Sequence, residues 1–129
     1  LQETGDPGQA GGVTVVIIMA SEKARNHLLK HGLVYTFRVR RRKGPSVKED
    51  WLTDRRGGRK IADVLVIEAP GNPVHIRELA LHVHESGFDS LWEWYEEIKR
   101  LNGGRLPETG WLYLVALWPT SLGDNNEMP

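Results

Sequence analysis

Hydrophobic residues in the first third of the chain follow a strand pattern and then a helical one. Residues 13–20 are apolar on both faces and rich in β-branched side chains, which predicts a buried strand. Ser21 is a suitable helix cap, and apolar positions then recur at helical spacing until Gly32. The pattern therefore predicts a short amphipathic helix directly after the first strand.

Alternation of apolar and polar residues begins at Leu33 and predicts a second, half-buried strand. In this interpretation the core face consists of Leu33, Tyr35, Phe37 and Val39. The solvated face consists of Val34, Thr36, Arg38, Arg40 and Arg42. Arginines on one strand face would stand about 7 Å apart, a spacing that suits consecutive phosphates of a nucleic acid.

A long basic loop is predicted over residues 44–60, because glycines and a proline interrupt the alternation there. Trp51 falls inside this predicted loop. Residues 61–68 are again apolar and strand-like, and they end at a cluster of turn residues. We therefore expect a strand that is entered from a glycine-rich, basic loop.

Two helices and a closing strand are predicted in the second half of the chain. Asn72 and Pro73 suit the start of a helix that ends at Gly87, and Ser90 begins a capping box for the next helix. Residues 111–118 form an unbroken apolar run, which is typical of a central strand with both faces covered. The predicted order of elements is that of an α+β protein.

The length of 129 residues is that of one domain, predicted over residues 13–119. Residues 1–12 are glycine-rich and predict a flexible arm, and residues 120–129 predict a flexible acidic tail. The chain begins with leucine, and whether an N-terminal segment is missing stays open. No apolar stretch is long enough to span a membrane, and the chain has no cysteine, so we expect a cytoplasmic protein without membrane contact.

The balanced net charge hides a strong asymmetry. Residues 38–60 carry ten positive and three negative side chains, whereas residues 61–129 carry four positive and eleven negative ones. A basic segment of this kind indicates a polyanionic partner. The alternative is that the two halves neutralise each other within the fold or in a dimer.

Several segments together resemble the ASCH domain, a member of the PUA-like group of small β-barrels. Residues 29–38 look like the family's stretch "Gly-Lys-Lys-Thr-x-x-x-Arg", and residues 57–64 are similar to its strand after a glycine- and lysine-containing turn. Residues 85–95 look like its element "Ser-Gly-Phe-x-Ser-x-x-x-Trp" and are followed by the closing strand. The resemblance implies a small PUA-like barrel with short helices packed at its ends, and it implies RNA as the partner.

The leading hypothesis is a noncatalytic RNA-binding module that contacts phosphates with its basic strand and loop, with a structured ribosomal or transfer RNA as the expected partner. Trp51 either stacks on an unpaired base or anchors the loop on the barrel. The oligomeric state stays open. The expected contact residues are Arg38, Arg40, Arg42, Lys43, Trp51, Arg55, Arg56, Arg59 and Lys60.

The resemblance also implies an alternative, a small amidohydrolase that acts on a modified nucleoside or RNA. The family's proposed nucleophile is a motif lysine, but here Leu33 and Val34 follow Gly32. A rearranged site would have to use Lys30, Thr36, Arg38 and Asp63. A third hypothesis is a protein-interaction domain whose acidic half docks a basic partner.

Metal and cofactor chemistry is not expected from the pattern of possible ligands. His27 and His31 have the spacing of two ligands on one helix face, but no third ligand is evident beside them. His75 and His82 are expected to be partly buried partners of backbone groups.

Overall fold

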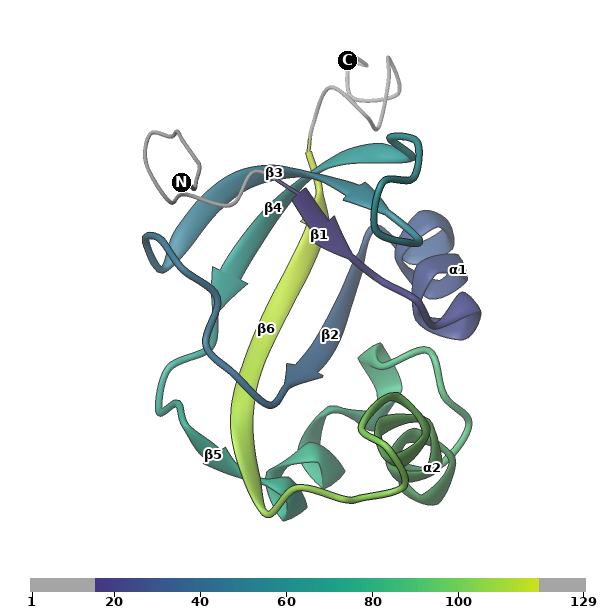
Figure 1. Cartoon of the computed structure of the whole chain (residues 1–129), viewed down its shortest axis with the longest axis vertical. Helices are drawn as coiled ribbons and strands as arrows, with labels where there is room; N and C mark the ends of the chain where they lie inside the picture. The colour runs from purple at the N-terminus through teal and green to yellow at the C-terminus, as the bar shows by residue number, and fades with distance from the viewer. Residues whose placement is uncertain (1–15, 119–129) are drawn as a thin grey trace.

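A computed structural model describes residues 16–118, which form one mixed β-sheet and three helices (Figure 1). The strands are β1 (Val16–Ile18), β2 (Leu33–Arg38), β3 (Val47–Thr53), β4 (Ala62–Glu68), β5 (Val74–His75) and β6 (Thr109–Leu117). The helices are α1 (Glu22–His31), the 3₁₀ helix η1 (Ile76–Glu85) and α2 (Leu91–Leu101). The α+β class is confirmed.

The sheet curls into a half-barrel, with strand order β1-β3-β4-β6-β2 and the short β5 paired to one end of β6. Among the strands described, the β1–β3 pair is parallel and the other pairs are antiparallel. β6 lies between β4 and β2, so the prediction of a central closing strand is confirmed. The barrel-like shape agrees with expectation, while the PUA-like type of barrel stays a prediction.

The core consists of two hydrophobic clusters on opposite faces of the sheet. One fills the concave side and includes Leu28, Val34 and Val115. The other lies where α2 and η1 cover the opposite face, and its buried centre includes Leu79 and Trp94. Because both faces are covered, the sheet needs apolar residues on both sides.

This double cover corrects the predicted phase of β2. Val34 and Thr36, expected in solvent, are buried, and Tyr35 and Phe37 are partly buried against the second cluster on the other face. β2 ends at Arg38, so Arg40 and Arg42 follow the strand rather than share a face of it. Threonine and arginine at alternate positions predict a solvent-exposed face, but the fold covers these positions.

The predicted loop over residues 44–60 is also wrong, because it contains β3. This strand pairs with β4 through six residue pairs, and Trp51 is one of its members. Lys48 and Asp50 stand on its inward face, where polar residues conceal the strand pattern. Two shorter connections therefore replace the long loop, at residues 39–46 and 54–61.

The helix predicted from Asn72 and Pro73 begins later and has a different type. The Asn72 side chain does not cap a helix; its Nδ2 donates to Leu112 O, and its Oδ1 accepts from Leu112 N, both at 2.9 Å. The following residues form β5, and η1 then begins at Ile76. His75 Nδ1 caps η1 by accepting from Arg77 N, which confirms the expected backbone partner of this histidine.

The other helix signals are confirmed. Ser21 caps α1 by accepting from Ala24 N, and Gly32 ends it in the left-handed region at φ 88°. Ser90 caps α2 by accepting from Glu93 N at 3.1 Å. The predicted arm and tail lie outside the described residues, and within residues 16–118 no helix has the length and apolarity needed to cross a bilayer.

Gly87, between η1 and α2, is expected to tolerate no side chain. Its φ is +90°, and a Cβ would stand 2.6 Å from Lys23 O. Gly71 has a φ of +87° but nothing within 4 Å of that position. Gly71→Ala should therefore lower the free energy of unfolding by about 1–2 kcal/mol, the cost of a left-handed backbone for alanine. Gly87→Ala should lower it by roughly 2–4 kcal/mol, because the steric clash adds to that cost. Urea unfolding of both variants checks this, and equal losses would contradict the close approach.

Candidate functional site

The two edge strands of the half-barrel, β1 and β2, are joined by arginine side chains. We call the region between them the seam. Arg38 Nη2 donates to Ile18 O at 2.9 Å, and Arg42 Nη2 donates to Val16 O at 3.1 Å. The backbone groups of an edge strand need partners, and here guanidinium groups supply them. The seam therefore places two cations at the side of the barrel.

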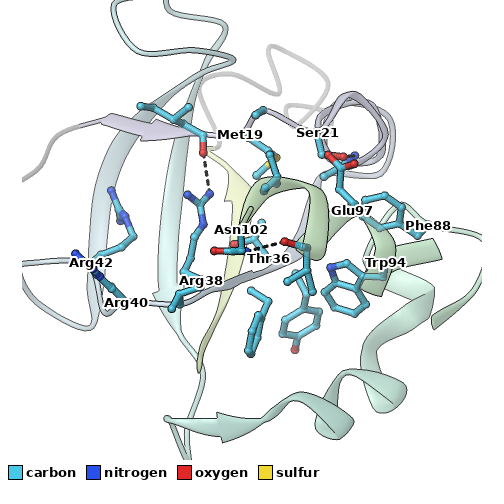
Figure 2. A pocket seen from close by; sticks show the side chains of 18 of the residues that line it. Met19, Ser21, Thr36, Arg38, Arg40, Arg42, Phe88, Trp94, Glu97 and Asn102 are labelled. Atoms are coloured by element: carbon cyan, nitrogen blue, oxygen red, sulfur yellow. Dashed lines mark hydrogen bonds between the residues drawn. The ribbon is translucent and has the colours of Figure 1, made fainter. Parts of the chain in front are cut away.

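A cleft of about 670 Å³ lies along the seam, between β2, the β1–α1 connection and α2. Figure 2 shows Arg38, Arg40 and Arg42 on one side of it and Phe88 and Trp94 on the other. This volume is within the range of small-molecule binding sites, roughly 300–1,000 Å³. A second hollow, of about 300 Å³, lies beside α1.

The wall opposite the arginines is aromatic and apolar. Trp94 is buried and stacks on Phe88 with a ring separation of 6.4 Å. Tyr35 and Phe37 continue this wall from β2. Because Trp94 is buried, the half-buried rings of Phe88, Tyr35 and Phe37 are the ones that a flat, unsaturated ligand can contact.

Thr36 supplies a polar atom in the cleft. Its side chain is buried, and its Oγ1 has no hydrogen-bond partner among the described residues. Leaving a buried hydroxyl unpaired is unfavourable, because the group loses its hydrogen bonds to water. Thr36 precedes Arg38 by two positions, so both lie on the same face of β2.

A group of charged side chains lies behind the arginine wall. Asp50 is buried, with Oδ2 at 2.5 Å from Arg42 Nη2 and Oδ1 at 3.5 Å from Lys48 Nζ. Burial and the nearby Arg42 lower the pKa of the Arg38 guanidinium to about 10. Burial also lowers the pKa of Lys48, although the Asp50 carboxylate opposes that shift. Both groups thus lie in a region where positive charge is in excess.

Arg41 anchors the same connection to β4 and β6. Its guanidinium binds both carboxylate oxygens of Glu68, at 3.0 and 3.1 Å, and lies 5.7 Å from the ring centre of Trp111. The backbone N–H of Arg42 donates to Tyr113 Oη at 2.7 Å. These contacts fix residues 39–46 against β4 and β6, so the arginine wall has a defined position.

The predicted RNA contacts come from the end of β2, from the two connections that flank β3 and from β3 itself. Residues 38–43 precede β3 in the chain and residues 55–60 follow it, so the two groups belong to different segments. Trp51 is half-buried within β3 and does not line the cleft. Trp51 is therefore not a loop anchor, because it belongs to a strand of the sheet.

Three of the eight predicted cations form ion pairs within the described residues. Arg42 pairs with Asp50, Arg55 with Asp54 and Lys60 with Asp63. Within residues 16–118, the exposed cations of the set that have no ion pair are Arg40, Lys43, Arg56 and Arg59. Only the first two lie near the cleft, and Arg40 lines it.

The four residues of the alternative hydrolase site are not brought together. Thr36 and Arg38 line the cleft, whereas Lys30 lines a separate hollow of about 300 Å³ beside α1. Asp63 lies on β4, with Oδ1 at 2.6 Å from Lys60 Nζ. No single site contains all four side chains.

The histidines contribute little to the cleft. The rings of His27 and His31 contact each other at 4.5 Å on α1, and burial lowers the pKa of His27. His82 packs against Tyr35 at 4.4 Å. In the described part of the chain, no three histidine or acidic side chains are grouped so that they could hold a metal ion.

Sequence reasoning missed the aromatic wall and the buried charged group. Trp94 carries a clear helical signal for burial but none for a neighbouring cleft. Lys48 and Asp50 alternate with Trp51 and Leu52 in a weak strand pattern that could have revealed β3. No family model, curated protein or solved structure matches this chain, so the resemblance to the ASCH family stays a prediction.

Proposed function

We propose that this protein is a PUA-like RNA-binding module that holds an unpaired nucleotide of a structured RNA in the seam cleft. The observation that carries the proposal is the pairing of an aromatic wall with an arginine wall across one cleft. Bases stack on aromatic rings, and phosphates pair with guanidinium groups, so the two walls suit the two halves of a nucleotide.

The basic connection supports RNA as the ligand. Arg40 and Lys43 are exposed and have no ion pair within residues 16–118, so they can meet phosphates without breaking an existing contact. Arg56 and Arg59 provide a second exposed pair in the connection that follows β3. A nucleotide in the cleft would contact the first pair, and a longer RNA would also reach the second.

Salt dependence gives a quantitative test of this proposal. Two engaged phosphates predict a slope of about −1.4 in a plot of log affinity against log salt, and four predict about −2.8, from about 0.7 per phosphate on a single strand. We expect a short single-stranded RNA to give the smaller slope and a structured RNA with an unpaired loop to give the larger one. Fluorescence anisotropy titrations between low and moderate salt measure both slopes.

Variants of exposed arginines identify the surface used. Arg40→Ala should flatten the slope of either RNA by about 0.7, because one phosphate contact is lost. Arg77→Ala is the control, since Arg77 is exposed on η1 and does not line the cleft. The proposal fails if neither RNA binds at low salt, or if both variants change the slope equally.

A further inference from the structure

The charged side chains at the seam do not balance one another. Arg38, Arg42 and Lys48 bring three positive charges, and Asp50 is the carboxylate that pairs with two of them. Glu97 also lines the cleft, but its carboxylate is held by Arg100 through two hydrogen bonds of 2.7 and 2.9 Å. Within the described residues, these side chains leave the seam with an excess of two positive charges.

Burial makes this excess significant. The side chains of Arg42 and Lys48 are 14% and 9% exposed, and that of Asp50 is fully enclosed. Charges removed from water are unfavourable unless opposite charge lies beside them. The lowered pKa values of Arg38 and Lys48 are the expected result of burial in a positive environment. A bound dianion would supply the missing opposite charge.

Hydrogen-bond donors at the seam remain available for such a ligand. A guanidinium has five N–H donors, and the one contact found for Arg38 is its bond to Ile18 O. Thr36 Oγ1 is buried without a partner, two positions away on the same strand. Lys48 Nζ also has no hydrogen bond with good geometry among the described residues. Arg38 and Thr36 both line the cleft.

We infer that the seam end of the cleft is a phosphate-binding site in which Arg38, Arg42 and Thr36 contact a phosphate monoester. The charge distinguishes the monoester from the diester of an RNA backbone. A monoester carries about −1.5 to −2 at neutral pH and therefore matches the excess, whereas a diester carries one negative charge. Such a group occurs at the phosphorylated end of an RNA and in a free mononucleotide. This inference rests on the proposed function only in naming an RNA end as one source of the phosphate monoester.

Thr36→Val is the decisive variant, because stability and binding should respond in opposite directions. Valine has a similar shape and removes an unpaired buried hydroxyl, so the variant should fold with equal or higher stability. Affinity for inorganic phosphate should fall about tenfold, because a hydrogen bond to a charged group is lost. Isothermal titration with phosphate, at an ionic strength fixed with chloride, measures the affinity, and urea unfolding measures the stability.

Thr53→Val is the matched control. Thr53 is also buried, but its hydroxyl donates to Arg55 O at 3.4 Å, and it does not line the cleft. This substitution should leave phosphate affinity unchanged. If the parent takes up no phosphate, or if both valine variants bind it as well as the parent does, the phosphate site is refuted.

Three further titrations separate the sources of the phosphate. An RNA with a terminal monophosphate should bind at least tenfold more tightly than the same RNA with hydroxyl ends, and Thr36→Val should remove most of this difference. Equal binding of the two RNAs, without phosphate uptake, would refute the site while the proposed RNA binding stands. Binding of cytidine monophosphate without binding of either RNA would support the site and refute the proposed function.

Discussion

Trp94→Ala should lower the free energy of unfolding by about 3–5 kcal/mol, the usual cost of removing a buried tryptophan. Trp94 is 3% exposed and joins α2 to the second hydrophobic cluster, where it stacks on Phe88. Deletion of the indole would leave a cavity between helix and sheet, because the neighbouring rings can fill only part of the space. Chemical denaturation followed by circular dichroism measures the loss.

Trp92→Ala provides the control for this prediction from the same helix. Trp92 is 73% exposed and contacts Tyr95 only edge to face at 5.7 Å. Its removal should change stability by less than about 0.5 kcal/mol. Similar losses for the two variants would show that α2 does not pack through the face that contains Trp94.

Asp50→Ala should be comparably damaging, with a loss of about 3–5 kcal/mol, for an electrostatic reason. The substitution leaves Arg42 and Lys48 largely buried without their shared carboxylate. The cost is the burial of unpaired charge rather than the loss of packing, since the side chain removed is small. Thermal and urea unfolding at neutral pH measure the effect.

Glu49→Ala is the appropriate comparison, because Glu49 is the neighbouring acid on β3 and is exposed. It removes the same charge from the protein but should change stability by less than about 0.5 kcal/mol. A small effect of Asp50→Ala would mean that solvent reaches Arg42 and Lys48 once the carboxylate is gone.

Local signals predicted much of the fold because the physics behind them is local. Ser21 and Ser90 cap their helices through hydrogen bonds that span only three residues. Gly32 ends α1 in a conformation that favours glycine. The apolar run of β6 indicated a strand covered on both faces, and the sheet places it between two neighbours. Such features do not depend on the rest of the chain.

Elements whose polar residues find distant partners could not be predicted in this way. β3 contains Lys48 and Asp50 on its inward face, and their burial depends on Arg42 from a different connection. Likewise, Asn72 looked like a helix cap but hydrogen-bonds the backbone of Leu112, forty positions away. In each case a long-range contact outweighs the local preference of the residue.

The candidate site was predicted only in part for the same reason. The basic composition pointed to the arginines, and Arg38 and Arg40 do line the cleft. The sequence could not show that Arg38 and Arg42 bind strand carbonyls, or that β3 divides the basic residues into two groups. The aromatic wall comes from α2 and β2, which are far apart in the chain and meet only in the folded protein.

The arginine contacts to β1 also affect the tendency of this protein to aggregate. A free strand edge is a template on which a second polypeptide can add by backbone pairing, the first step in many kinds of aggregation. Here the outward carbonyls of Val16 and Ile18 already accept from guanidinium groups, and a charged side chain occupies the approach. The two arginines thus block the addition of a strand from another molecule at the open side of the half-barrel, while the adjoining cleft stays accessible to ligands.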